Sequence, residues 1–234
     1  MASVLIFVFS NKLFLKNKRL DESRRAFISA TAHELKTPIT IIENRSEFIV
    51  ENVNPDKNEE YIKSIYEESR RMDALVKELL CYNRITSLKK IKLTDCDLSE
   101  IVNSEIKKYE PAAAQKDIQI ITNIQDGVII KAESELIALA VDNYLSNAFK
   151  HTEKGKSVIV TLNKARFSVF NEGEQIKKED ANIIFDEFFK TDKARTGDGS
   201  SGIGLAVTRK IFELHKMKYG FNNKTDGVEF YCEF

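Results

Sequence analysis

The chain has 234 residues, of which 42% are hydrophobic and 31% charged, and its 36 basic residues balance its 36 acidic residues. This length and composition suit one or two soluble globular domains. No basic excess is available to neutralise phosphates, so a nucleic-acid partner is not expected. The cysteines show no CxxC spacing, which argues against disulfides and a zinc site: they are Cys81, Cys96 and Cys232.

The N-terminus begins with a short apolar run at residues 4–9, followed by the basic residues Lys16, Lys18 and Arg19. The run is far shorter than the ~20 residues that span a bilayer, and it lacks the cleavage site of a signal peptide. Basic residues after an apolar run are typical of the cytoplasmic side of a membrane helix. We therefore expect residues 1–22 to be the end of a transmembrane helix, whose beginning is missing, and a juxtamembrane linker. A short amphipathic anchor or a disordered end is the alternative.

A long helix is expected over residues 20–52. At 100° per residue, one side of it carries an apolar stripe, formed by Ile28, Thr31, Leu35, Ile39, Ile42 and Ile49. His33 falls about 160° from the centre of this stripe and so faces water. Thr37 lies one turn further on the same face. Pro38 removes a helical hydrogen bond and should bend the helix.

A second long helix is expected from Asp56 to Leu88, because Asn54-Pro55 ends the first one. Its apolar seam steps by three and four residues: Ile62, Ile65, Ser69, Met72, Val76, Leu79 and Asn83. Two such helices form a hairpin. One hairpin cannot bury both stripes, whereas two hairpins can do so as a four-helix bundle. The pattern therefore predicts a homodimer.

The periodicity breaks at residues 94–99, which places a dimerisation domain over residues 23–92 and a second domain over residues 93–234. Asp97 or Ser99 can cap a helix over residues 100–115. Further helices are expected at 133–152, near 179–185 and from about 202 to 215. Strands are expected at 118–124, 128–131, 157–162, 166–170, 219–222 and 228–234. This order predicts an α+β sandwich with one mixed sheet and helices on one face.

Three segments of the second domain carry residue types suited to a nucleotide. Asn143, Asn147 and Lys150 share one helix face, where an amide oxygen suits Mg²⁺ and lysine suits phosphate. A solvated polar face is the plainer alternative. Gly173 follows a strand and permits close approach of the backbone. Gly202-Ile203-Gly204 opens a helix whose N–H groups can meet phosphate oxygens.

The segment FISATAHELKTPIT, residues 27–40, closely resembles the phospho-acceptor box of the sensor histidine kinases of two-component systems. NYLSNAFKHT at 143–152 resembles their N-box, and the F-box and second glycine box have counterparts at 184–190 and 202–206. The boxes follow the family order over about residues 22–234. The resemblance implies a helical-hairpin dimerisation domain, a four-helix bundle in the dimer, followed by an α/β sandwich ATP-binding domain of the GHKL type.

By this resemblance, His33 is the nucleophile that ATP phosphorylates, and Glu34 acts as its general base. The phosphoryl group then passes to a receiver-domain aspartate of a response regulator, and Thr37 positions the water that dephosphorylates the regulator. Asn143 is implied as the Mg²⁺ ligand. Lys193 and Arg195 are weaker candidates for phosphate contact. The remaining residues implied to contact the nucleotide are Asn147, Lys150, His151, Asn171, Gly173, Ile176, Gly202, Gly204 and Leu205.

Two positions depart from the family pattern. Asn171 stands where the family has an aspartate that accepts from the adenine amino group, and Gln175 replaces the second glycine of the same box. An amide oxygen still accepts, but without charge. These replacements motivate an alternative function, a non-catalytic scaffold that dimerises and senses ATP. A chaperone-like or topoisomerase-like ATPase is a second alternative, against which the intact acceptor box speaks.

The Asn-x-Gly box at residues 171–173 and the Asp-Gly-Val-Glu-Phe segment at residues 226–230 also resemble, more loosely, the glycopeptide-resistance and cell-envelope sensors of Gram-positive bacteria. This resemblance implies a protein of the cell membrane whose kinase core faces the cytosol.

Overall fold

The computed structural model describes residues 2–190 and 201–234, and before Arg25 it describes the side chain of Lys18 alone. The chain forms two compact units, Met1–Lys77 and Glu78–Phe234. The boundary between them falls inside the second long helix. The domain boundaries expected from the sequence stay predictions.

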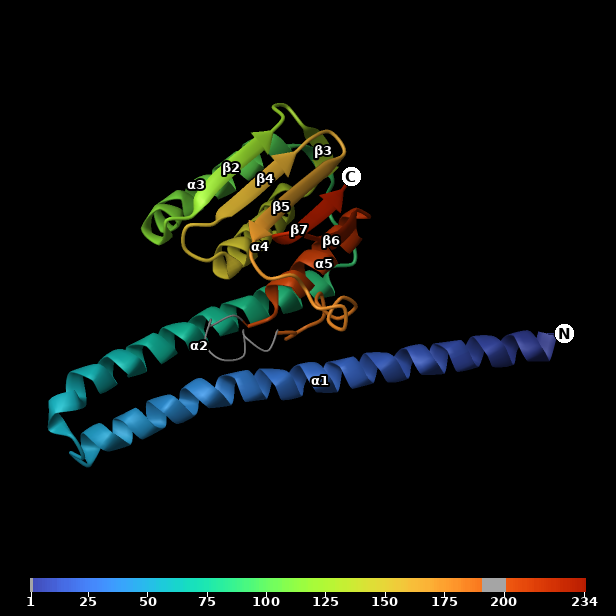
Figure 1. Ribbon diagram of the computed structural model, residues 1–234. Helices are drawn as coiled ribbons and strands as arrows, with labels where there is room; N and C mark the ends of the chain where they lie inside the picture. Colours follow the sequence, from blue (N-terminus) through green and yellow to red (C-terminus); the bar gives the residue numbers. More distant parts are fainter. Residues whose placement is uncertain (1, 191–200) are drawn as a thin grey trace. The chain divides into compact units, whose positions relative to one another are not determined.

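The first unit is a helical hairpin, as the sequence predicts. Helix α1 spans Ala2–Val50, a 3-10 turn η1 spans Pro55–Lys57, and α2 spans Asn58–Ser87 (Figure 1). Asn52 adopts a left-handed φ of 53°, a conformation that asparagine tolerates well. The Val53 amide can therefore bond back to the Phe48 carbonyl at 3.1 Å. This turn and Pro55 end α1 where the sequence predicts.

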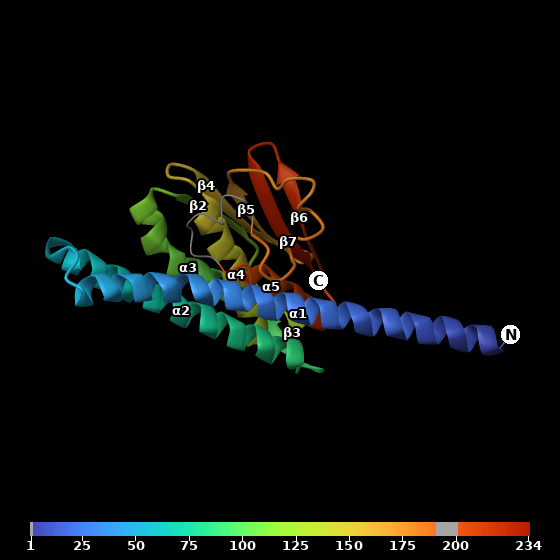
Figure 2. The same ribbon diagram turned by 90° about the horizontal axis from the view of Figure 1, so that it is seen from below.

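The inside of the hairpin is held by an aromatic contact near the turn. Tyr61 of α2 is 6% exposed, and its ring lies 5.6 Å from the ring of Phe48 on α1. The Arg45 guanidinium covers the same tyrosine ring at 5.2 Å. Helix α1 extends towards the N-terminus well beyond the expected residue 20 (Figure 2). Across the described residues, no helix combines the length and the apolar character that crossing a membrane requires.

The second unit is built on a five-stranded mixed sheet in the order β2-β4-β5-β7-β6. Strands β2 and β4 are parallel, and all other neighbours are antiparallel. One face of β4 and β5 is fully buried, because every second residue is at most 1% exposed: Val158, Val160, Leu162, Phe167 and Val169. The strands are β2 Gln119–Ile124, β4 Ser157–Leu162, β5 Arg166–Glu172, β6 Lys218–Lys224 and β7 Gly227–Glu233.

Three helices cover this buried face (Figure 1). They are α3 Leu98–Lys116, α4 Ser134–His151 and α5 Gly204–His215. Asp97 caps α3, since its carboxylate accepts from the amides of Ser99 at 2.9 Å and Glu100 at 3.2 Å. The layered arrangement confirms the predicted α/β sandwich.

Tyr144 of α4 lies at the centre of this core and is completely buried. Its ring contacts aromatic rings from a strand, from α5 and from a second strand: Phe167 at 6.4 Å, Phe212 at 5.7 Å and Phe230 at 5.6 Å between centroids. Its hydroxyl donates to the Tyr231 carbonyl at 3.2 Å, which satisfies the only polar group that the ring buries. Helix α4 is thereby fixed in rotation against the sheet.

Two expectations about the second unit were wrong. Strands β1, Thr94–Asp97, and β3, Ile129–Ala132, form a separate antiparallel pair, so the described residues of this unit form two sheets instead of one. The helix expected near residues 179–185 is a series of turns. Here Phe185 packs its ring against Tyr219 at 5.1 Å and Phe230 at 6.2 Å. Packing of this half-buried aromatic ring against β6 and β7 outweighs the weak local helical pattern.

The end of α5 is tied to the beginning of α4 by His215. Its Nε2 accepts from the backbone N–H of Glu133 at 3.0 Å, and its Nδ1 lies 2.8 Å from the Ile211 carbonyl oxygen. The ring must therefore be neutral, with the proton on Nδ1. Burial lowers the pKa of His215 below its ordinary value of 6.5, which favours this neutral form.

The stability of the second unit should therefore fall in mild acid. Because the folded pKa of His215 is lowered, its contribution is fully present above pH 6.5 and is lost as the pH falls through the folded pKa. Replacing His215 by Phe leaves the Glu133 N–H without its acceptor and should cost about 1–3 kcal/mol at pH 7.5. Urea unfolding followed by circular dichroism, from pH 7.5 to pH 5, measures both effects.

The difference between wild type and His215→Phe should shrink as the pH falls. His33→Gln removes an exposed histidine of the first unit and is the matched control, which should leave the free energy of unfolding of the second unit at pH 7.5 unchanged. A difference that stays constant across this pH range would contradict the assigned tautomer.

Candidate functional site

The predicted acceptor segment lies on α1. His33 is exposed, as its helical position predicts, and Glu34 beside it is half-buried. One turn further, the Thr37 hydroxyl donates a long hydrogen bond of 3.4 Å to the His33 carbonyl oxygen. Pro38 is buried within the helix and has no N–H for the Glu34 carbonyl. The backbone is therefore weakened one turn after the histidine, and the bend itself stays a prediction.

The polar face predicted for α4 is present. Asn143 and Asn147 are half-buried and Lys150 is exposed. The Asn143 amide nitrogen donates to the Gly204 carbonyl at 3.2 Å. This bond joins the middle of α4 to the first residue of α5 and leaves the Asn143 amide oxygen as the end of the side chain that can accept. The other side of α4 is at most 2% exposed at Val141, Leu145 and Ala148.

The end of β5 lies against the C-terminal end of α4. A Cβ on Gly173 would lie 2.9 Å from the His151 carbonyl oxygen, so only glycine allows this approach. Asn171, two residues earlier, is 1% exposed. Its amide oxygen has no hydrogen-bond partner among the described residues. A buried acceptor without a partner is unusual in a folded protein and points to a ligand contact.

Gln175, which replaces a family glycine, has a structural role. Its side-chain nitrogen donates to the Lys224 carbonyl at 2.6 Å, at the turn between β6 and β7. Ile176, half-buried, is held by Asn223 through two bonds, from its N–H at 2.9 Å and to its carbonyl at 2.8 Å. Hydrogen bonds from the side chains of Gln175 and Asn223 thus hold the segment after Gly173 against the sheet.

The second glycine segment leads directly into α5. Gly202 has a φ of 75°, and a Cβ there would lie 2.6 Å from the Phe189 carbonyl oxygen. The Phe188 amide donates to the Gly202 carbonyl at 3.0 Å. The residues before and after the undescribed stretch are thereby held together, next to the first turn of α5 with Gly204 and the half-buried Leu205. Lys193 and Arg195 lie outside the described residues.

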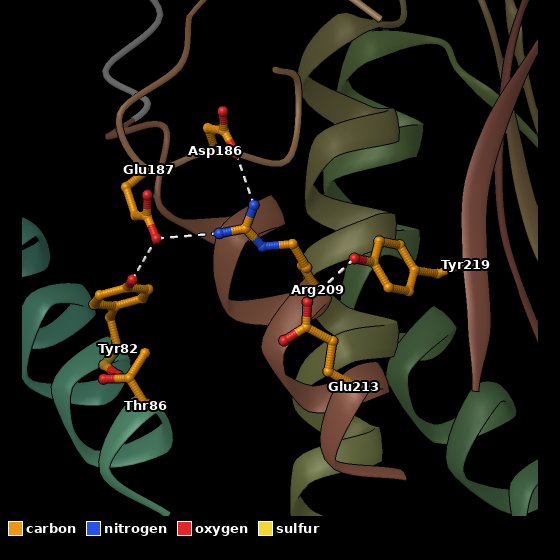
Figure 3. Close-up of polar contacts among 7 residues, drawn as sticks. All are labelled: Tyr82, Thr86, Asp186, Glu187, Arg209, Glu213 and Tyr219. Carbon is orange, nitrogen blue, oxygen red and sulfur yellow. Dashed lines mark hydrogen bonds and ion pairs between the residues drawn. The ribbon is translucent and has the colours of Figure 1, made fainter. Parts of the chain in front are cut away.

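A polar network that the sequence motifs do not indicate connects α2 with α5 (Figure 3). The Tyr82 hydroxyl donates to the Glu187 carboxylate at 2.5 Å. Arg209 of α5 donates to the same carboxylate at 3.2 Å and to Asp186 at 2.7 Å. Burial, together with this hydrogen bond to Glu187, raises the pKa of Tyr82. A second link joins the Ser201 hydroxyl to the Glu78 carboxylate.

The structure shows two separate contacts among the predicted nucleotide residues, and the roles of all of them stay predictions. Asn143 meets Gly204, the His151 carbonyl meets Gly173, and Asn171 lies on the strand that ends at this point. Sequence reasoning missed Tyr82 and Arg209. The contact spans 105 positions between Tyr82 and Glu187, and no motif in the sequence connects them.

Comparison with known proteins agrees with this arrangement. Residues 23–88 match the family model of the His Kinase A (phospho-acceptor) domain, and residues 132–234 match that of the histidine kinase-, DNA gyrase B-, and HSP90-like ATPases. The ATPase model implies ATP binding, and the phospho-acceptor model implies dimerisation. A phospho-acceptor hairpin followed by such an ATPase fold defines a histidine kinase core. The chain belongs to the family of sensor histidine kinases.

Three relatives illustrate the similarity. The heme sensor protein HssS of Staphylococcus haemolyticus is 29% identical over 91% of this chain and 47% of its own length. The sensor protein VanSB of Enterococcus faecalis is 27% identical over 93% of this chain and 50% of its own. The chain thus spans about half the length of these curated relatives. The crystal structure of the histidine kinase ThkA in complex with the response regulator TrrA superposes with a TM-score of 0.70 at 25% identity, covering 94% of this chain and 65% of that one.

The polar network predicts a measurable effect of Tyr82 on stability. Tyr82→Phe removes one hydroxyl bond to Glu187 and should lower the free energy of unfolding of the second unit by about 1 kcal/mol. Urea unfolding followed by circular dichroism measures this loss. Tyr66→Phe removes a hydroxyl from a tyrosine of the same helix that belongs to the first unit, and it should have almost no effect on the unfolding of the second unit. Equal effects of the two variants would contradict the energetic role of the network.

Proposed function

We propose that the protein is an ATP-dependent histidine kinase that autophosphorylates His33 and passes the phosphoryl group to an aspartate of a response regulator. The observation that carries this proposal is the exposure of His33 on a phospho-acceptor helix, in a chain that also contains an ATPase fold with an unpaired buried acceptor at Asn171. A surface histidine needs no burial to act as a nucleophile, because it must meet the nucleotide of a separate domain.

The residues around the ends of α4 and β5 fit an adenine nucleotide. The amide oxygen of Asn171 lacks a partner and would accept from the adenine amino group. The backbone at Gly173 and Ile176 would line the base. Asn147, Lys150 and His151 at the end of α4, with Gly202, Gly204 and Leu205 at the start of α5, would surround the phosphates, since the free N–H groups of a helix N-terminus favour anions.

A magnesium ion fits the same site. The Asn143 amide nitrogen is engaged by the Gly204 carbonyl, so its oxygen remains to bind a hard cation. When bound, Mg²⁺ would neutralise negative charge on the triphosphate. Asn143 is the residue that would hold it.

The chemistry needs one nucleophile and little else from the protein. A ring nitrogen of His33 attacks the γ-phosphorus, the bond to the β-phosphate oxygen breaks, and ADP leaves. Glu34 would orient or take the proton on the other ring nitrogen. His33 and Glu34 are adjacent, and adjacent residues of a regular helix do not share a face. Pro38 lacks the N–H that would donate a backbone hydrogen bond to the Glu34 carbonyl, so the helix is weakened at this point. The receiver aspartate then attacks the phosphohistidine and restores His33.

A homodimer is the proposed working form. Residues on the outer side of the hairpin leave apolar surface uncovered, which a second hairpin would bury as a four-helix bundle. The exposed fractions are 58% for Ile28, 59% for Ile62, 63% for Tyr66, 42% for Val76 and 64% for Leu80. We also propose that the protein works at the cell membrane, with the described part facing the cytosol.

Substitution of the acceptor tests the kinase proposal directly. His33→Gln removes the ring nitrogens and should reduce labelling of the protein by γ-³²P-ATP to background. ATP binding by the same variant, measured by calorimetry, should stay unchanged, since His33 lies outside the nucleotide site. Label retained by the variant would refute the assignment of His33. ATP binding without any labelling of the wild type would instead favour the scaffold alternative, and sustained hydrolysis by His33→Gln would favour the ATPase alternative.

Thr37 is proposed to position the water for dephosphorylation of the regulator. Thr37→Ala should retain autophosphorylation and slow the dephosphorylation of a phosphorylated receiver domain by roughly a hundredfold, because a misplaced water loses that much. Thr37→Ser should restore the rate. Thr31→Ala is the matched control, because Thr31 makes the same type of bond to the backbone one turn before it, at 2.8 Å. An equal loss in both alanine variants would point to a helix effect.

A further inference from the structure

The side chain of Asn171 is enclosed by the protein core, yet nothing in the core bonds to its oxygen. Cα partners across a sheet point to the same face. The partners of Asn171 are Val158 on β4 and Val228 on β7, which are 0% and 4% exposed. Its neighbours along β5 on that face are the buried Phe167 and Val169. The amide is therefore the only polar side chain in a row of apolar ones across the helix-covered face of these three strands.

The space beside this amide is kept open by a glycine. A Cβ on Gly173 would lie 3.4 Å from the Asn171 amide nitrogen and 2.9 Å from the His151 carbonyl oxygen. The Gly173 amide is itself used, because it donates to the Asp226 carbonyl at 2.9 Å. Among the described residues, neither end of the Asn171 amide is held by a hydrogen bond. The group can thus present its oxygen or, after a half-turn about its last bond, its nitrogen.

This freedom changes which base the position can recognise. A carboxylate only accepts hydrogen bonds, whereas an amide accepts through oxygen and donates through nitrogen. The 6-amino group of adenine needs an acceptor. The 6-oxo group of hypoxanthine or guanine needs a donor, and a carboxylate facing it would place two acceptors together in a buried site. An amide at the same position meets either group without repulsion.

We infer that Asn171 makes the nucleotide site accept 6-oxopurine nucleoside triphosphates as well as ATP. The inference rests on the proposed function, because it takes the base to lie against Asn171. A site that hydrogen-bonds one polar group rejects a mismatched analogue by about 10⁴-fold or more, and a carboxylate here would exert such selection. With the amide, the affinities for the two classes of base should lie within about tenfold, the range of a single neutral hydrogen bond.

Inosine triphosphate is the decisive probe, because its base differs from adenine at the 6-position and at the neighbouring ring nitrogen and has no added 2-amino group. Calorimetry on the full chain with Mg²⁺ gives the dissociation constants for ATP and inosine triphosphate. Labelling of His33 with the γ-³²P form of each nucleotide gives a second readout. The expected ratio of dissociation constants in the wild type is below about tenfold. In Asn171→Asp the ratio should rise at least a hundredfold in favour of ATP.

The outcomes separate the two proposals. ATP binding with inosine triphosphate bound more than a hundredfold more weakly by the wild type would overturn the inference and leave the kinase proposal intact. Failure of the wild type to bind ATP would overturn the proposed function itself. If Asn171→Asp fails to fold, the ratio of the wild-type dissociation constants for inosine triphosphate and ATP still tests the inference. Asn171→Ala, which removes both donor and acceptor, should weaken both nucleotides and leave their ratio near that of the wild type.

Discussion

The rotation of α4 is the constraint on which the candidate nucleotide site depends. Tyr144 is completely buried, with three aromatic neighbours and a bonded hydroxyl. A helix anchored in this way cannot turn about its axis without opening the core. At about 100° per residue, Asn143 and Asn147 lie roughly 100° and 60° from Tyr144 on the same flank of the helix, so anchoring Tyr144 also fixes the direction of these two side chains. The direction in which the polar face of α4 points therefore follows from the packing of its apolar face.

Close approach of backbone segments then assembles the site around α4. Gly173 brings the end of β5 against the carbonyl of His151, and Gly202 brings the start of α5 against Phe189. In both contacts a Cβ would lie less than 3.0 Å from backbone atoms, so each of these close approaches requires glycine. The hydrogen bond that the Asn143 amide donates to the Gly204 carbonyl joins α4 to the first residue of α5. The result is a helix N-terminus, a polar helix face and a buried amide at one end of the sheet.

Local pattern was sufficient for the parts of this fold that depend on periodicity. The hairpin, the buried face of α4 and the bounds of β4 follow from spacings of three to four or of two residues. The separate pair of β1 and β3 was missed because each strand has four residues, too short for alternation to be evident. The motif order likewise located Asn171 and Gly173. It could not indicate that Gln175 bonds to Lys224, since that contact joins segments about fifty positions apart.

The contacts of His215 and Tyr82 were equally out of reach of sequence reasoning, and they have the same physical origin. Each side chain bonds to a partner on another element, the Glu133 amide and the Glu187 carboxylate respectively. Such bonds depend on how elements pack, so their residues look like ordinary surface positions in a sequence.

The position of Tyr82 on α2 has a consequence for the architecture. The boundary between the two compact units lies after Lys77, and α2 continues to Ser87 without a break. The last turns of α2 therefore belong to the ATP-binding unit, where Ile85 is completely buried and Tyr82 shares the Glu187 carboxylate with Arg209. The bonds from Tyr82 and Arg209 to Glu187 join α2 to α5 through one carboxylate, and Arg209 is held in addition by Asp186. Helix α2 thus begins in the first unit, and its last turns pack into the second.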